Sequence, residues 1–209
     1  MATSSSPAEN PDAAAPPDAG PPDPVPALTV AVIGSARLSP PDPRCEPAEQ
    51  IGAAIAAEGW AVMTGGYGGL MEVTSRAAAQ ADGYVIGLPM RGWTGLTPNP
   101  WNHELRWSDT YPERLAHFLA ADAVIAVDGG IGTLAEAAIV WAALQTEPTA
   151  PGLIFVGSGW PAVLESLGAH LVIDDRDLGL VNVCPDPRLA IAHIAETRSD
   201  RPRAPSPRG

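Results

Sequence analysis

The sequence predicts a single α/β domain built on a mainly parallel, doubly wound β-sheet. Short apolar runs alternate with Ala-rich helical segments along the chain, which is typical of strands joined by crossover helices. Two of the runs lead through a glycine-rich turn into a helix. The segments 1–27 and 197–209 instead combine proline with small or charged residues and show no apolar period. We therefore expect a folded domain at 28–196 between two disordered tails.

Apolar periodicity locates the individual elements. Continuous or alternating apolar runs predict strands at 28–33, 60–63, 84–88, 104–107, 123–127, 153–156 and 171–173. Helical spacing predicts helices at 49–58, 113–121, 161–167 and 189–194, together with one that ends near 80 and one that ends near 145. Gly59 ends the first of these helices.

The turn after the strand at 123–127 is the strongest candidate for a ligand site. The strand stops at Asp128, and the turn that opens the next helix consists of Gly129, Gly130, Gly132 and Thr133. The glycines leave the backbone open to a ligand, and the first helical turn offers unpaired N–H groups that bind phosphate. Glu136 follows Thr133 by three residues, so we expect its carboxylate beside this site. The same pair also fits a capping box, in which Glu136 only returns a hydrogen bond to the helix start.

A second turn has the same construction. After the strand at 60–63 the chain enters a glycine-rich segment and then an Ala-rich helix; the candidate binding residues are Gly65, Gly66, Gly69, Met71 and Glu72. Glu72 would contact a ribose hydroxyl or simply complement the helix dipole. Ser35 and Arg37 follow the first strand, at the edge where open α/β sheets bind ligands. Arg37 is equally well explained as a solvated loop residue.

These turns resemble the motifs of a known family. Gly65-Gly-Tyr-Gly-Gly-Leu-Met71 is similar to the GGGxxGLM motif of the LONELY GUY (LOG) proteins, and Gly129-Gly-Ile-Gly-Thr-Leu-Ala-Glu136 is similar to their PGGxGTxxE motif. With Ile33-Gly-Ser-Ala-Arg37, the spacing over about 28–145 resembles that of the wider SMF–DprA–LOG superfamily. The resemblance implies a Rossmann-like fold, usually a homodimer, and a nucleoside 5′-monophosphate phosphoribohydrolase that releases a free base and ribose 5-phosphate.

The resemblance also implies roles for the site residues. N-glycosidic cleavage passes through an oxocarbenium-like centre, which a nearby carboxylate stabilises while it orients or deprotonates water. Glu136 is the candidate for this role, and the helix N-terminus is expected to keep it ionised. The N–H groups of 129–133 would hold the 5′-phosphate. Arg114 matches the family's catalytic arginine and would grip phosphate or ribose, with Arg37 assisting.

Two positions depart from the family pattern. Asp128 stands where the family has proline, so it brings a negative charge near the proposed phosphate site. Arg114 lies one residue nearer Asp122 than the family's MHERK-like segment suggests. Related superfamily members are proposed to carry molybdenum cofactor or only to bind nucleotides. The departures keep open a non-catalytic carrier or sensor of a nucleotide or molybdopterin-like ligand.

A dinucleotide-dependent oxidoreductase is a further alternative. Gly130-Ile-Gly-Thr-Leu-Ala135 fits the G-x-G-x-x-G/A fingerprint. However, that fingerprint normally follows the first strand, and an acid should end the next strand. The strand at 153–156 is followed by Gly157-Ser-Gly159 instead.

The absence of lysine and the spacing of cysteine and histidine argue against several kinds of cofactor and metal site. All 12 basic residues are arginine, so the chain has no lysine for a pyridoxal phosphate Schiff base or for a Walker A loop. We expect no cofactor. Cys45 and Cys184 lie far apart, and the four histidines lack metal-ligand spacing, so we predict no metal site.

Charge and hydropathy constrain the partners. The body at 28–196 holds 19 acids and 8 arginines, a net charge of −11, which disfavours nucleic acid as a partner. No apolar run reaches transmembrane length and the N-terminus lacks a signal-peptide pattern, so we expect a cytoplasmic protein without a membrane partner.

The segment 89–103 is long for a connection in a compact domain, and such connections are often lids or binding loops. It contains Trp93 and Trp101. Either ring would stack on a base, or the two would pack the loop down or line a dimer interface.

Overall fold

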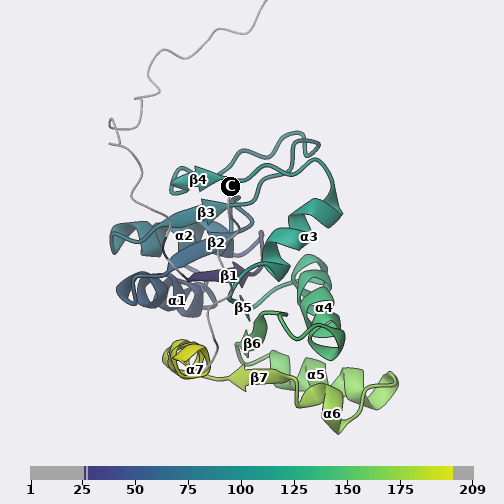
Figure 1. The fold of residues 1–209 in the computed structure, drawn as a ribbon. Coiled ribbons are helices and arrows are strands. Elements are labelled where there is room, and N and C mark those ends of the chain that lie inside the picture. The colour runs from purple at the N-terminus through teal and green to yellow at the C-terminus, as the bar shows by residue number, and fades with distance from the viewer. Residues whose placement is uncertain (1–25, 27, 200–209) are drawn as a thin grey trace, which may run out of the picture.

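The sheet is entirely parallel and doubly wound, as predicted. The computed structural model describes residue 26 and residues 28–199. Within them one sheet has the strand order β4-β3-β2-β1-β5-β6-β7 (Figure 1). The strands are β1 (Thr29–Ile33), β2 (Ala61–Thr64), β3 (Val85–Gly87), β4 (Glu104–Leu105), β5 (Ala123–Ala126), β6 (Gly152–Val156) and β7 (Val181–Cys184). From β1 the sheet grows to β2 on one side and to β5 on the other, so β1 and β5 flank the switch point where such sheets bind ligands.

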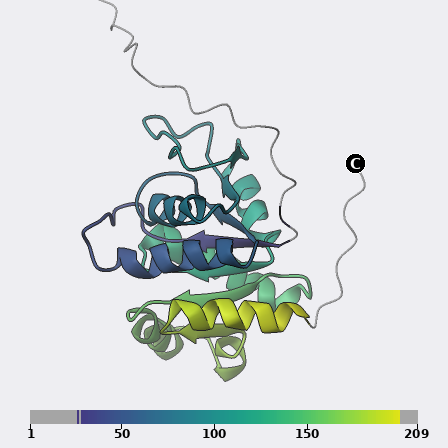
Figure 2. The same ribbon diagram turned by 90° about the vertical axis from the view of Figure 1, so that its left-hand side faces the viewer.

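Helices cover both faces of the sheet, in a Rossmann-like three-layer arrangement. One face carries α1 (Cys45–Ala57), α2 (Leu70–Gln80) and α7 (Pro187–Ser199), which lie in front of the strands in Figure 2. The other face carries α3 (Tyr111–Leu119), α4 (Ile131–Thr146), α5 (Trp160–His170) and α6 (Asp175–Leu178) (Figure 1). Each face has its own apolar core. Because β2 and β5 are buried on both faces, their sequences are continuous apolar runs.

The strand predicted at 171–173 is wrong. Leu171 is 57% exposed and Val172 is fully exposed, so this segment is a surface loop between α5 and α6. The last strand is β7, which pairs with β6 and has a mixed burial pattern because it lies at the edge of the sheet. The four-residue α6, with its own capping box at Asp174 and Asp177, was also not predicted.

The element ends differ from the predicted ones by a few residues. α1 begins at Cys45, four residues before the predicted start, and α3 begins at Tyr111 because Thr110 and Glu113 form a capping box there. α7 continues to Ser199, past the predicted domain end at 196. Apart from residue 26 and residues 197–199, the two predicted tails lie outside the described residues. No helix in the described part is long and apolar enough to span a bilayer.

Candidate functional site

The two glycine-rich turns meet at the carboxyl edge of the sheet, and Ser35 joins them. The Ser35 backbone N–H donates to the carbonyl of Asp128 over 3.0 Å. The Ser35 carbonyl accepts a hydrogen bond from the N–H of Leu70, the first residue of α2, over 2.8 Å. The turns after β2, β1 and β5 are therefore parts of one structure, since these three strands are neighbours in the sheet.

The turn before α2 is a packing structure. Gly65 and Gly66 are buried. A Cβ on Gly65 would collide with the guanidinium of Arg114 and the sulfur of Met71, and one on Gly66 would lie 3.1 Å from Gly87 Cα. Gly69 has φ +74°, and its Cα lies so close to the turn after β1 that no side chain fits. The first N–H of α2 is already bonded to Ser35, so this helix start is less available to a ligand than that of α4.

The turn before α4 is open to solvent. Its residues 129–132 are all exposed, and the positions of a Cβ on Gly130 or Gly132 are empty. Gly130 is the N-cap and no side chain caps the helix. The first intrahelical bond runs from Leu134 N–H to the Gly130 carbonyl over 3.0 Å, which leaves the preceding N–H groups pointing out of the helix end. This helix start has the geometry of an anion site.

The capping-box interpretation of Thr133 and Glu136 is wrong. α4 begins at Ile131, so Thr133 is already its third residue and Glu136 lies in the second turn. The Thr133 side chain is 3% exposed and packs under Gly129, where a Cβ would collide with it. Glu136 is thus free of any helix-capping role.

Glu136 forms a buried ion pair with Arg114 of α3. Arg114 Nη2 lies 3.6 Å from Glu136 Oε1, and the two side chains are 4% and 12% exposed. Burial raises the pKa of the Glu136 carboxyl above its usual value, and Arg114 opposes this only in part. Desolvation thus shifts the pKa of Glu136 in the direction opposite to the helix dipole, which the sequence analysis expects to keep this carboxyl ionised.

The environment of Arg114 is almost closed. Its Nη1 donates to the carbonyls of Gly65, over 3.3 Å, and of Leu88, while its Nε is buried without a partner. Its guanidinium carbon lies 5.2 Å from the ring centroid of Trp93 and 5.5 Å from that of Phe118. The shifted position of Arg114 in the sequence thus still brings it to Glu136, but its charged group lies beneath an aromatic ring.

Asp128 faces away from this pair. A Cβ on Gly157, in the turn after β6, would lie 3.1 Å from Asp128 Oδ1, so the carboxylate extends toward β6. Burial raises its pKa, Arg44 lowers it and Asp42 raises it. The residue that replaces the family's proline therefore neighbours the start of α1 and the turn after β6, rather than Glu136.

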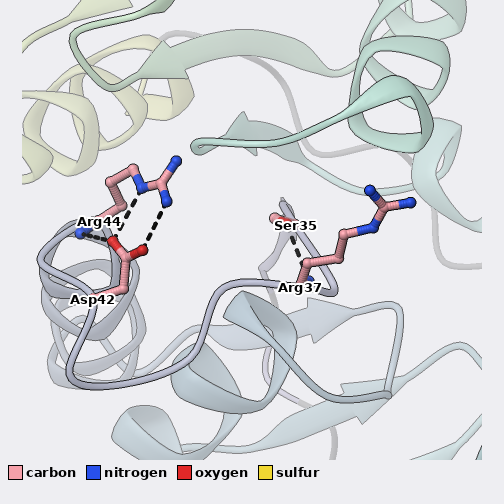
Figure 3. Close-up of polar contacts among 4 residues, drawn as sticks. All are labelled: Ser35, Arg37, Asp42 and Arg44. Atoms are coloured by element: carbon pink, nitrogen blue, oxygen red, sulfur yellow. Dashed lines mark hydrogen bonds and ion pairs between the residues drawn. The ribbon is translucent and has the colours of Figure 1, made fainter.

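The turn after β1 brings two arginines to the same edge. In Figure 3, Arg44 forms a bidentate ion pair with Asp42, in which Nε donates to Oδ1 over 3.0 Å and Nη2 donates to Oδ2 over 2.7 Å. Arg37 lies on the opposite side of Ser35, and its exposed side chain extends away from that pair. Its N–H donates to Ser35 Oγ over 3.0 Å, so the Ser35 hydroxyl holds the turn itself.

The remaining predicted residues lie around the first turn. Met71 is buried against Gly65. Glu72 lies in the first turn of α2, half-buried, with Oε2 3.8 Å from where a Cβ on Gly68 would be.

An aromatic group beside Arg114 was not predicted. Trp93 stacks on Tyr67, with ring centroids 5.8 Å apart, and on Tyr111, with centroids 6.4 Å apart. The Tyr111 hydroxyl has a raised pKa, because of burial and the nearby Glu136. The sequence carried a signal for Tyr111, since it precedes Arg114 by three residues on a capped helix and so shares a helix face with it.

Chemically, the site combines an open helix N-terminus, a carboxyl of raised pKa and a guanidinium. A group of three or more metal-ligating side chains does not occur among the described residues. The dinucleotide fingerprint also fits poorly, because the turn follows β5 and β6 leads into Gly157 with no acid.

The fold is shared with several solved structures. The molybdenum cofactor binding protein from Rippkaea orientalis is 25% identical, with a TM-score of 0.66 over 82% of this chain and 97% of that one. The Moco carrier protein from Chlamydomonas reinhardtii is 23% identical, with a TM-score of 0.65 over 83% and 98%. DNA processing protein A from Helicobacter pylori, described by its single-stranded DNA binding mode, is 15% identical, with a TM-score of 0.55 over 82% of each chain.

Sequence comparison gives the family. No curated protein matches the chain significantly. The model of the SLOG cluster4 family matches residues 27–146, more than half of the sequence and all of the elements that build the site. The superfamily expected from the glycine motifs is thereby confirmed, and the chain belongs to the SLOG cluster4 family.

Proposed function

We propose that this protein is a nucleoside 5′-monophosphate phosphoribohydrolase acting on AMP or N6-modified AMP. The phosphate would bind the exposed N–H groups at the start of α4, and the sugar would face Glu136. Water adds to C1′ of the ribose, the base leaves with a proton, and the products are the free base and ribose 5-phosphate. The observation that carries the proposal is the buried Glu136–Arg114 pair directly behind an uncapped helix start.

The state of Glu136 supports the chemistry. A general base works best when its pKa is near the operating pH, and burial raises the pKa of this carboxyl in that direction. Arg114 adds positive charge 3.6 Å from the carboxylate, where it would also contact ribose or phosphate oxygens. Neither role needs a metal or an organic cofactor, and none is proposed.

The test is the release of ribose 5-phosphate from AMP and from N6-alkylated AMP. Replacement Glu136→Gln should reduce turnover about 10²–10⁴-fold, the usual contribution of a positioned acid or base. The matched control is Glu165→Gln, an exposed glutamate of α5 on a helix outside the site. Undiminished turnover by Glu136→Gln would remove Glu136 from the mechanism.

A non-catalytic carrier is the second candidate. It is favoured by the similarity to molybdenum cofactor binding proteins. It is also favoured by the position of the Trp93 ring over Arg114, which limits the access of a substrate to the Glu136–Arg114 ion pair. Retention of a nucleotide or molybdopterin-like ligand through gel filtration, without hydrolysis of any nucleotide offered, would favour it over the enzyme. In either case the partner is a small phosphorylated molecule rather than nucleic acid, and a cytoplasmic location stays a prediction.

A homodimer is also proposed, from the outer face of α4. Its exposed apolar residues include Ala135, Ala138, Ile139 and Ala142, and the only charged residue of the helix, Glu136, faces Arg114. An uncharged helix surface in a chain of net charge −12 is typical of an interface.

Light scattering after gel filtration tests this interface. Ile139→Arg should give a monomer, because the new charge would be buried in the contact. Val163→Arg is the matched control, since Val163 of α5 is 38% exposed and Ile139 is 42% exposed. A dimer that survives Ile139→Arg would contradict the assignment.

A further inference from the structure

The segment from Met90 to Asn99 is anchored at both ends. Next to the first anchor, the Arg91 N–H donates to the Ser108 carbonyl over 3.0 Å and Arg91 Nε lies 3.2 Å from Asp109 Oδ1. Met90 is 6% exposed and its N–H donates to the Tyr67 hydroxyl over 2.7 Å. Asn99 is 8% exposed; its N–H donates to the Gly66 carbonyl over 2.8 Å and its side-chain amide donates to the Tyr67 carbonyl over 2.9 Å. Residues 91–97 are all exposed. Both anchors are therefore on the first glycine turn, and residues 92–97 form the exposed part of the segment beyond the Arg91 contacts.

Trp93 lies in this exposed part, and its ring lies over Arg114, the partner of Glu136. Trp93 is 38% exposed, whereas the side chains of Arg114 and of its ion-pair partner Glu136 are 4% and 12% exposed. The Trp93 backbone N–H donates to the Met90 carbonyl over 3.4 Å. The ring itself is held by stacking on Tyr67 and Tyr111 and by the guanidinium of Arg114, none of which is a hydrogen bond. Such contacts break without leaving a polar group unpaired.

Glycines flank Trp93 on both sides. A Cβ on Gly92 or Gly95 would meet no atom within 4 Å, and Gly95 has φ +80°. Neither glycine is therefore required by close packing. Their placement gives the backbone freedom to rotate on each side of the ring while the anchors at Met90 and Asn99 stay in place.

We propose that the Trp93 indole is a built-in plug, which occupies the slot for a planar bicyclic heteroaromatic base beside Tyr67 and Tyr111. The proposal rests on the proposed function, in that the ligand's sugar must reach Glu136. An indole and a purine are both flat fused rings of a five- and a six-membered cycle. A base attached to a sugar at Glu136 needs the space over Arg114 that the indole fills. Binding then requires the loop to swing out, after which the base stacks on the two tyrosines.

Calorimetry with AMP and with ribose 5-phosphate tests the plug. Trp93→Ala should bind AMP roughly tenfold more tightly than the parent protein, because no ring contacts need be broken before the base enters. Ribose 5-phosphate, which has no base, should bind both proteins within about twofold. The matched control is Trp107→Ala: this ring is 41% exposed and lies over Arg91, at 5.6 Å, rather than over Arg114.

The outcomes separate the plug from the proposed function. If ribose 5-phosphate binds but Trp93→Ala leaves AMP affinity unchanged or weaker, the plug is overturned and the phosphate site stands. If neither protein binds either compound, both proposals are overturned. A ligand-free readout is carbodiimide labelling of carboxylates followed by mass spectrometry. Glu136 should react several-fold faster in Trp93→Ala than in the parent or in Trp107→Ala, and equal rates would overturn the plug without reference to any ligand.

Discussion

Replacement of Glu136 by glutamine should reduce turnover about 10²–10⁴-fold without reducing stability. The carboxylate has one charged partner, Arg114 Nη2 at 3.6 Å. At that distance the attraction is about 5 kcal/mol with an effective dielectric constant of about 20. Desolvation of a buried ion costs several kcal/mol, so the two effects are of similar size. The raised pKa of Glu136, caused first by burial, shows that desolvation is the larger.

The raised pKa of Glu136 implies that the Glu136→Gln variant gains stability at high pH. Because the folded-state pKa lies above the unfolded value, the contribution of this carboxyl to stability is fully present below the unfolded pKa, near 4.3, and is lost as the pH rises through the folded pKa. At pH 8 the variant should therefore have a higher free energy of unfolding, and a higher Tm, than the parent protein. Its advantage should shrink toward pH 4.

Urea unfolding at several pH values measures the difference in the free energy of unfolding between the variant and the parent. The comparison is valid where the two proteins have equal m-values. Glu165→Gln is the control, because an exposed substitution should stay within about 0.5 kcal/mol of the parent at every pH. A loss of about 3–5 kcal/mol by Glu136→Gln would refute the reasoning, since that is the penalty for leaving a buried arginine without a partner it needs.

Four other substitutions test the geometry, each by urea unfolding. Gly69→Ala should cost about 3 kcal/mol, whereas Gly95→Ala, also at positive φ but with no neighbour, should cost only about 1 kcal/mol; equal losses would contradict the close approach at Gly69. Arg114→Lys should cost about 2 kcal/mol, because one ammonium group cannot bind the Gly65 and Leu88 carbonyls and Glu136 together. An unchanged free energy of unfolding would show that the guanidinium geometry is not needed. Thr110→Ala should cost about 1 kcal/mol, and an unchanged midpoint would dispute the capping box of α3.

The central strands and both glycine turns could be predicted from the sequence because their apolar runs and glycine clusters are visible in short segments of the chain. β1, β2, β5 and β6 are buried on both faces, so burial appears directly as an apolar run. The prediction failed at β7. This edge strand is short and contains the polar Asn182, so the apolar run Leu171-Val172-Ile173 was predicted as the last strand instead. Those residues are apolar yet largely exposed, which no single-sequence pattern reveals.

The residues of the candidate site could be named from the sequence, but their environment could not. The spacing Thr133-x-x-Glu136 placed an acid near a helix start, but not the helix start itself, which lies two residues earlier at Ile131. Whether Glu136 caps the helix or faces Arg114 depends on α3, which comes from another part of the chain. Burial, and hence the direction of the pKa shift, arises only when these distant elements pack together.

Helix capping distinguishes the site from the rest of the molecule. α3 and α6 are closed by capping boxes at Thr110 and Asp174, so their first N–H groups are used internally. The helices that follow β2, β5 and β6 have glycine at the N-cap and no side-chain cap, and glycine there costs a helix about a few tenths of a kcal/mol relative to a capping side chain. At α2 the Ser35 carbonyl offsets part of that cost, and at α5 the Asp128 carboxylate lies close by. Only α4, among these three, is left with exposed N–H groups and an acid behind them, and this is the arrangement that a bound anion would stabilise.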